Sequence, residues 1–171
     1  YGGGGAPFAM GILSGEIGIA SNMAFYMGPG LSQGAIKAIL KKANKELKDK
    51  YLPKMISGEW MGTMCLTEPQ CGTDLGLIRT TAIPEEDYYK LNGQKIWISF
   101  GEHDLTENII HLVLARLPDA PAGIKGISLF LVPKRLDDNS RNPIFCGGLE
   151  HKLGIISSPT CVMNMDDAKG W

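Results

Sequence analysis

The spacing of apolar residues changes near Trp60, and this change most restricts the folds open to the chain. Over residues 6–26, apolar side chains recur at helical intervals of three, four and seven. After Trp60, short alternating runs are separated by turn signals about every eight to twelve residues, which is typical of a β-barrel or sandwich. We therefore predict an α+β fold, in which an N-terminal α-helical segment precedes an antiparallel β-barrel or sandwich domain.

The helical segment should contain three helices. The first ends at Gly28-Pro29-Gly30, because glycine and proline interrupt helical hydrogen bonding. The second runs to about Asn44, and a short third begins at Lys45 and ends at Pro53. We place the boundary so that residues 1–58 form part of a helical domain and residues 59–171 form the β domain.

The β domain should contain eight strands. The predicted strands cover residues 61–67, 77–83, 87–92, 95–100, 109–116, 127–132, 143–149 and 160–165. Asn92-Gly93 lies between two of them and predicts a type I′ hairpin turn, because both central positions of that turn need positive φ.

Composition limits the partners of the chain. Its 171 residues are 44% hydrophobic and 20% charged, which is ordinary for a soluble globular protein. The net charge of −1 gives no basic field for nucleic acid or an anionic membrane, and no run of about twenty apolar residues is present. We expect no membrane segment, no nucleic-acid partner and a cytoplasmic location. The first residues, Tyr1 and a glycine run, and the last, Trp171, suggest an excerpt of a longer protein.

Cysteines and histidines offer no metal site or disulfide framework. The four cysteines show no C-x-x-C spacing, so we expect free thiols in a reducing cytosol. Three histidines lack partners at ligand spacing: His103, His111 and His151. We interpret them as polar or structural.

Residues 63–74 form a strand that ends in a polar turn. The strand breaks at Glu68-Pro69, because a residue before proline is excluded from the helical region. Gly72, Thr73 and Asp74 then offer backbone N–H groups and a hydroxyl that could hold a pyrophosphate. The alternative is an ordinary strand exit capped by threonine and aspartate.

The strand at 95–100 has two different faces. Because side chains alternate along a strand, Lys95, Trp97 and Ser99 should share one face. The opposite face is entirely apolar and should enter the core. The indole of Trp97 and the hydroxyl of Ser99 could then bind a flat heterocycle with polar edges: the indole would pack on the ring and the hydroxyl would bond a ring nitrogen. The alternative is an exposed amphipathic strand with a partly buried tryptophan.

These two segments resemble the acyl-CoA dehydrogenase family. Thr67-Glu68-Pro69 and Gly72-Thr73-Asp74 match its T-E-P-x-x-G-S-D motif, and Gly93 to Ser99 match G-x-K-x-W-I-[ST]. The resemblance covers about residues 10–170. Within the family, Gly101-Glu102-His103-Asp104 and the segment His111 to Arg116 look most similar to the 3-methylmercaptopropionyl-CoA dehydrogenase branch.

The resemblance implies an FAD site and an activity. The residues that it assigns to FAD are Met64, Leu66, Thr67, Gly72, Thr73, Trp97, Ile98 and Ser99. Thr73 would also approach the CoA of the substrate, and the Ser99 hydroxyl would lie near flavin N5. The implied reaction is flavin-dependent α,β-dehydrogenation of an acyl-CoA thioester, with an electron-transfer flavoprotein-like acceptor and a homo-oligomeric intact enzyme.

The resemblance assigns no catalytic residue to this chain. The family's catalytic base is a carboxylate of a C-terminal helical domain, which this chain lacks, so we expect the chain to be inactive alone. We interpret the carboxylates of Glu68, Asp74, Glu102 and Asp104 as structural. Two alternatives remain: an acyl-CoA oxidase, or a flavin-containing, DNA-binding protein similar to the alkylation-response branch. The near-neutral charge disfavours the second alternative.

Overall fold

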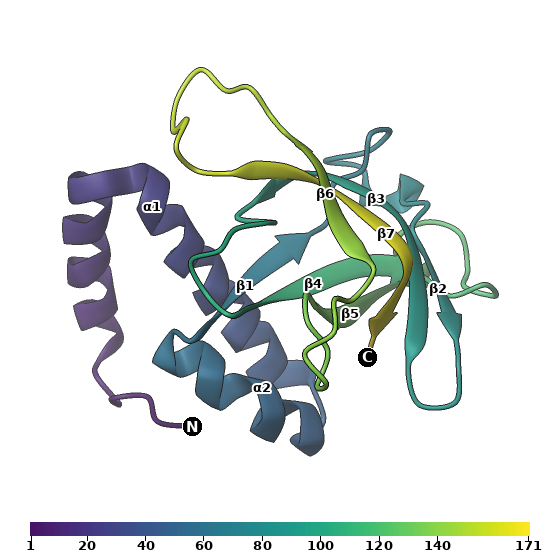
Figure 1. Cartoon of the computed structure of the whole chain (residues 1–171), viewed down its shortest axis with the longest axis horizontal. Helices are drawn as coiled ribbons and strands as arrows, with labels where there is room; N and C mark the ends of the chain where they lie inside the picture. The colour runs from purple at the N-terminus through teal and green to yellow at the C-terminus, as the bar shows by residue number, and fades with distance from the viewer.

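The chain folds as two helices against one curled sheet, and the computed structural model describes all 171 residues (Figure 1). The helices are α1 (Phe8–Lys42) and α2 (Lys45–Ser57), and two short 3-10 turns are η1 (Leu75–Leu77) and η2 (Ile124–Gly126). The strands are β1 (Trp60–Cys65), β2 (Thr81–Pro84), β3 (Tyr89–Ser99), β4 (Asn108–Arg116), β5 (Ile127–Pro133), β6 (Ile144–Leu149) and β7 (Thr160–Gly170).

The sheet joins strands in the order β1-β4-β2-β3-β7-β6, and β5 pairs with β4. Most strand pairs are antiparallel, and the α+β prediction of helices followed by a β domain is confirmed. β1 and β4 are parallel instead, with Trp60 opposite Asn108 and Cys65 opposite Val113. The long connection between these strands contains β2 and β3, and it supplies the crossover that a parallel pair requires.

Two apolar cores lie on opposite faces of the sheet. The first lies inside the curl and includes Leu91, Ile98 and Val113. The second lies where the helices pack on β4 and β5, and Tyr51 and Ile110 belong to it. β4 contributes to both cores and is buried on both faces, which explains why its sequence is mostly apolar apart from the buried His111.

The first helix bends earlier than predicted. The non-helical residue is Asn22, at φ −158° and ψ 89°, while Pro29 lies inside the helix. Asn22 Oδ1 accepts a hydrogen bond from the Phe25 N–H at 3.1 Å, so Asn22 caps a new helical start. The bend brings Tyr26 back onto Gly18, where an added Cβ would lie 2.3 Å from the Tyr26 ring. The absence of a side chain at Gly18 therefore permits this close contact.

The prediction that Pro53 ends its helix was wrong. α2 continues to Ser57 and ends at Gly58, whose φ of 86° is left-handed. Pro53 is exposed, so the carbonyl that it leaves without a helical partner can bond water. Beyond it, Met55 packs in the core with Leu52 and stabilises the last turn.

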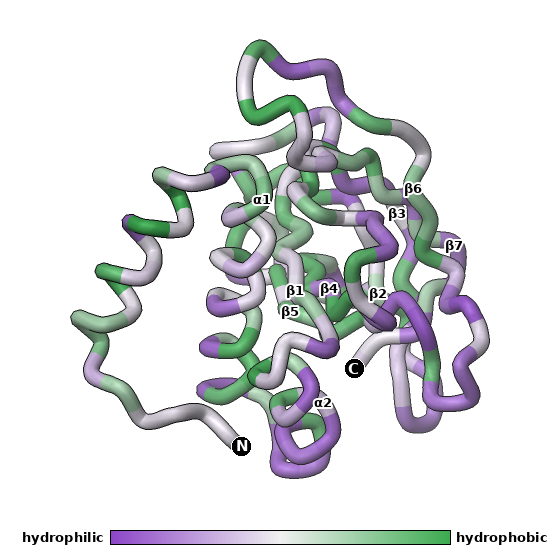
Figure 2. The backbone as a smooth tube through the Cα atoms, turned by 60° about the vertical axis from the view of Figure 1, so that its left-hand side comes forward, coloured by the Kyte–Doolittle hydropathy of each residue, from purple (hydrophilic) through white to green (hydrophobic).

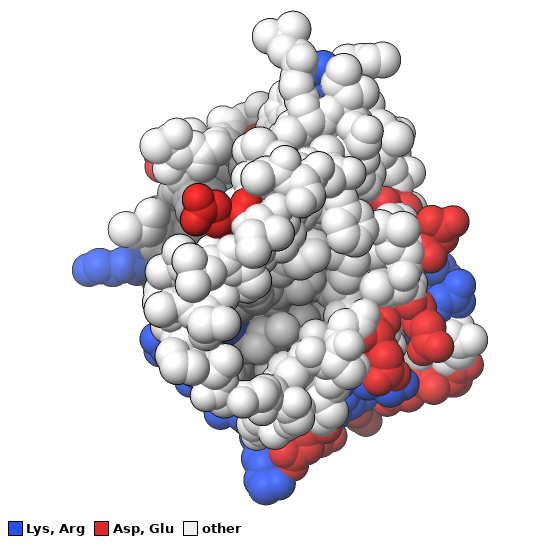
Figure 3. Space-filling view, turned by 90° about the vertical axis from the view of Figure 1, so that its left-hand side faces the viewer, with Lys and Arg blue, Asp and Glu red and all other residues white.

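The N-terminal arm of α1 carries many exposed apolar side chains. Figure 2 shows hydrophobic residues recurring along this arm. A cavity of about 850 Å³ lies between this arm and the second half of α1, lined among others by Phe8, Ile12 and Ile36. The face above it is hollowed and bears few charges in its middle (Figure 3). By length and composition alone α1 could cross a membrane, with an 18-residue window of mean hydropathy 1.2 that is not buried. Asn22 interrupts this helix, and the expected lack of a membrane segment stays a prediction.

The predicted hairpin at Asn92-Gly93 was wrong. Both residues lie inside the continuous strand β3, and the turn is formed earlier, where the Glu85 N–H bonds the Tyr88 carbonyl at 2.9 Å. A β-bulge lies between Leu91 and Gly93. An added Cβ on Gly93 would lie 2.6 Å from Thr80 Oγ1, so the glycine serves a close backbone approach instead of a turn.

Candidate functional site

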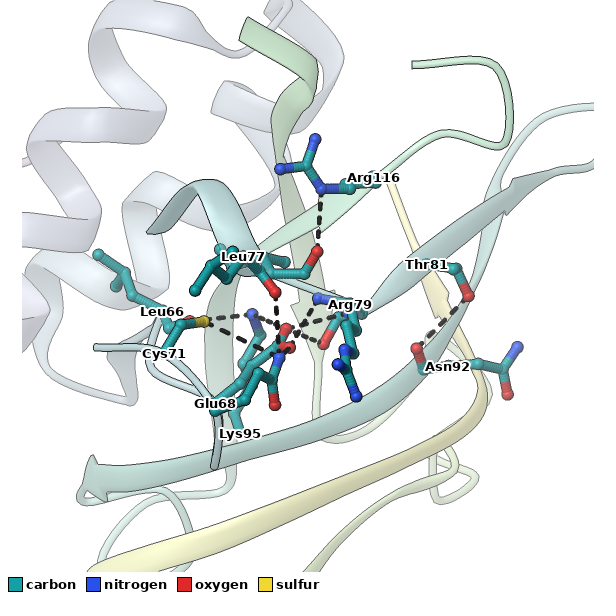
Figure 4. Close-up of polar contacts among 12 residues, drawn as sticks. Leu66, Glu68, Cys71, Leu77, Arg79, Thr81, Asn92, Lys95 and Arg116 are labelled. Carbon is teal, nitrogen blue, oxygen red and sulfur yellow. Dashed lines mark hydrogen bonds and ion pairs between the residues drawn. The ribbon is translucent and has the colours of Figure 1, made fainter. Parts of the chain in front are cut away.

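The two motifs of the sequence meet at the end of β1. The Ile96 N–H of β3 donates to the Thr67 carbonyl at 2.9 Å. Beneath this contact, Lys95 Nζ donates to the Leu66 carbonyl at 3.0 Å and to Glu68 Oε1 at 2.8 Å (Figure 4). Segments about thirty residues apart in sequence therefore form one surface.

Lys95 points inward, which corrects the predicted face. Lys95 is fully buried, whereas Trp97 is 52% exposed. Lys95 lies opposite Met163 and Ile98 opposite Cys161, so β3 has one more residue than β7 in this interval. This bulge, with Trp97 in the left-handed region at φ 60°, breaks the alternation. Lys95 and Ile98 consequently both face inward, and Trp97 faces outward as predicted.

Glu68 is the centre of the buried polar network. Its Oε1 accepts from Lys95 and from the Thr80 N–H and hydroxyl, at 2.8, 3.0 and 2.5 Å. Its Oε2 accepts from the Arg79 N–H at 2.7 Å and from Gln70 Nε2 at 2.6 Å. Burial alone would raise the pKa of Glu68, but the hydrogen bonds from Lys95, Thr80 and Arg79 lower it to about 2. The structural role predicted for Glu68 is confirmed.

Arg116 holds the far side of the turn. Its guanidinium donates to the Gly76 and Ile78 carbonyls at 2.6 and 2.9 Å, and to the Gly123 and Pro121 carbonyls at 2.7 and 3.1 Å. Four carbonyls from two loops thus share one cation. The sequence contained Arg116 within a family motif but gave no sign of this role.

The eight residues predicted to bind FAD lie on the two segments that meet at this junction, and the side chain of Met64 packs against the helix-side core. Gly72, Thr73 and Trp97 are exposed, and four others are half-buried: Met64, Leu66, Thr67 and Ser99. Ile98 is the exception, because its side chain is 2% exposed and belongs to the inner core. Any contact between Ile98 and a cofactor would come from its backbone.

The exposed groups suit a flavin. Trp97 presents a large apolar ring to solvent from a strained backbone conformation, which persists only where the surrounding structure fixes it. Ser99, two residues further along β3, adds a half-buried hydroxyl. The turn at Gly72 and Thr73 is open, and Asp74 braces it by accepting from the Gly76 N–H at 3.1 Å. An aromatic plane, a hydroxyl and an open polar turn match a heterocycle that carries a pyrophosphate.

A second polar cluster lies just beyond the C-terminal end of β3, where Glu102 follows Ser99 by three residues. Glu102 pairs with Lys134 and with Arg141, the latter at 2.5 Å. Burial raises the pKa of the Glu102 carboxyl, but hydrogen bonds from Arg141 and Lys134 outweigh it, and the pKa is lowered overall. His103 lies beside this cluster, and His111 is fully buried with Nδ1 2.7 Å from Thr63 Oγ1.

No group of three or more His, Cys, Asp or Glu side chains could hold a metal ion. All four cysteines are free, and Cys146 is the one that is not buried.

Two family models match the chain. Residues 63–168 match "Acyl-CoA dehydrogenase, middle domain", and residues 1–59 match "Acyl-CoA dehydrogenase, N-terminal domain". The 3-methylmercaptopropionyl-CoA dehydrogenase of Ruegeria pomeroyi is 50% identical over 177 residues, which cover 100% of this chain and 30% of that relative. The chain therefore spans less than a third of this relative's length.

Solved structures show the same fold. An acyl-CoA dehydrogenase complexed with FAD from Bacillus anthracis has 30% identity and a TM-score of 0.61, covering 74% of this chain and 20% of that one. Caenorhabditis elegans ACDH-11 in complex with C11-CoA has 26% identity and a TM-score of 0.72, covering 84% and 26%. Since the middle-domain match alone covers more than half of the sequence, the chain belongs to the acyl-CoA dehydrogenase family.

Proposed function

We propose that the whole protein is an FAD-dependent acyl-CoA dehydrogenase and that this chain supplies much of its flavin-binding surface. The observation that carries the proposal is the Ile96–Thr67 backbone bond, which unites the two flavin motifs. The relatives bound to FAD and to C11-CoA support the cofactor and the substrate class.

Three side chains orient the ring. Trp97 packs on the flavin with its exposed indole, and Ser99 donates a hydrogen bond at its polar edge. Thr67 lies next to Glu68, so the buried network fixes its position. The bound flavin supplies hydride acceptance, while these residues supply orientation and exclude water from one face.

The turn supplies the anion contacts. Gly72 has no side chain, so a pyrophosphate can approach its backbone closely. Thr73 is exposed, and its hydroxyl and N–H can reach either the pyrophosphate or the CoA. Because Thr73 can contact the CoA, it is the one residue of this chain that we assign to substrate binding.

The base comes from elsewhere in the protein. Glu68 is buried and engaged by Lys95, and Glu102 is paired with two cations. Neither carboxylate can accept a proton from substrate without losing these partners. We assign the base to a C-terminal helical domain outside this chain.

The remaining organisation is also proposed. Residues 1–58 form part of the helical domain and residues 59–171 the middle domain of a homo-oligomer. An electron-transfer flavoprotein-like protein accepts its electrons, and its free cysteines suit a reducing cytoplasm. The R. pomeroyi relative suggests a short acyl-CoA such as 3-methylmercaptopropionyl-CoA as substrate.

The test uses the full-length protein. Purified protein should show flavin absorption that bleaches when 3-methylmercaptopropionyl-CoA or butyryl-CoA is added without oxygen. Rapid re-oxidation by air with release of hydrogen peroxide would identify an oxidase instead. Protein that takes up no FAD, or whose flavin no acyl-CoA reduces, would refute the proposed dehydrogenase.

A further inference from the structure

The buried pair of Lys95 and Glu68 lies between the two halves of the flavin surface. Lys95 is two residues before Trp97, and Glu68 directly follows Thr67. Lys95 is 0% exposed and Glu68 3% exposed, so neither side chain can contact a bound flavin itself. Any effect of the pair on the cofactor must pass through the residues that it holds.

Glu68 closes the binding turn at both ends. It accepts from Gln70 near the start of the turn and from Arg79 and Thr80 at its end. The same carboxylate therefore fixes both ends of the segment that contains Thr73 (Figure 4). No other carboxylate of the chain bonds both ends of this segment.

Lys95 joins this turn to the strand that carries the aromatic ring. Its ammonium donates to the Leu66 carbonyl at the end of β1 and to Glu68 at the start of the turn. The bulge that turns Lys95 inward also turns Trp97 outward. The inward lysine and the outward indole are thus two results of one backbone distortion.

We propose that Lys95 and Glu68 are positioning residues, which set the distance between the pyrophosphate turn at Gly72–Thr73 and the ring-binding pair of Trp97 and Ser99. This inference rests on the proposed function. FAD spans both groups, and binding sites lose affinity when their supporting contacts loosen by about an ångström. A buried ion pair with several satisfied hydrogen bonds is suited to this geometric task.

The test compares four variants of the full-length protein: Lys95→Met, Glu68→Gln, the double variant of both, and Glu102→Gln. Glu102 is the control, because it is a carboxylate that pairs with cationic side chains, Lys134 and Arg141, but bonds no residue of the binding turn. FAD affinity is measured by fluorescence quenching, and the melting temperature of the apoprotein is measured in parallel.

Each single variant at the pair should weaken FAD binding about tenfold or more. Glu102→Gln should lower the melting temperature but change FAD affinity less than about threefold, since it leaves the turn in place. The double variant leaves no unpaired buried charge, so its melting temperature should recover in part. Its FAD affinity should stay weak, because methionine cannot bond the Leu66 carbonyl.

Other outcomes overturn the inference. If the affinity of the double variant recovers together with its stability, the pair acts on folding alone. If Lys95→Met binds FAD as tightly as the wild type, the pair does not position the site. A wild-type protein that binds no FAD would instead refute the proposed function, so the two failures are distinguishable.

Discussion

We predict that one buried histidine, His111, makes the unfolding free energy fall as the pH is lowered below 6.5. His111 on β4 is 0% exposed, Thr63 Oγ1 lies 2.7 Å from its Nδ1, and its Nε2 has no hydrogen-bond partner. Burial lowers the pKa of His111 from 6.5 to about 3, and the opposing charge of Glu102 does not offset it. The folded protein therefore holds His111 neutral where an unfolded chain would protonate it.

The size of the effect follows from this shift. Because the folded pKa is lower than the unfolded one, the stability from His111 is complete above pH 6.5 and is lost as the pH falls toward 3. Within this window, each unit by which the pH falls lowers the unfolding free energy by about 1.4 kcal/mol. Between pH 7 and pH 5 the unfolding free energy should therefore fall by about 2 kcal/mol through this residue.

His111→Asn isolates this contribution. An amide can keep a hydrogen bond to Thr63 but does not titrate, so the variant loses packing equally at every pH. We expect the wild type to lose about 2 kcal/mol more than the variant between pH 7 and pH 5, measured by hydrogen exchange of β4 amides in the full-length protein. His103, whose pKa is also lowered, mainly by burial, titrates in both proteins and cancels in the comparison. Equal losses, or an NMR titration of His111 near pH 6.5, would refute the reasoning.

Three further predictions follow from other parts of the structure. Trp97→Ala should weaken FAD binding about tenfold while Trp97→Phe keeps most of it, since a ring remains to pack on the flavin; equal affinities would remove Trp97 from the site. Thr73→Val should lower FAD or acyl-CoA affinity about ten- to a hundredfold in titrations, and Thr73→Ser should be nearly silent. Gly93→Ala should lower the free energy of unfolding by about 1–3 kcal/mol, measured by thermal denaturation, because the φ of Gly93 is 149° and an added Cβ would clash with Thr80. Gly34→Ala, with open space around it, is its control, and equal melting temperatures would contradict the clash.

The sequence alone predicted the elements whose signals are local. Helical spacing before Trp60 and alternation after it placed the helices before the strands, and the strand predicted at 109–116 matches β4 closely. The predicted apolar face of β3 correctly placed Ile98 and Phe100 inside and Trp97 outside, but Ile96 of the same predicted face is only half-buried. The Glu68-Pro69 break predicted a strand end at residue 67, two residues after β1 ends at Cys65, for a steric reason that needs no tertiary information.

The tertiary structure decided what depends on distant partners. Lys95 turns inward because a bulge against β7 and the carboxylate of Glu68 are both available, and alternation along one strand contains neither. Asn92-Gly93 stays inside β3 because Thr80 approaches Gly93, although the dipeptide by itself favours a turn. The parallel pairing of β1 with β4 likewise depends on a long crossover. The sequence thus predicted which residues form the candidate site, while long-range hydrogen bonds and strand register determined how these residues are held together.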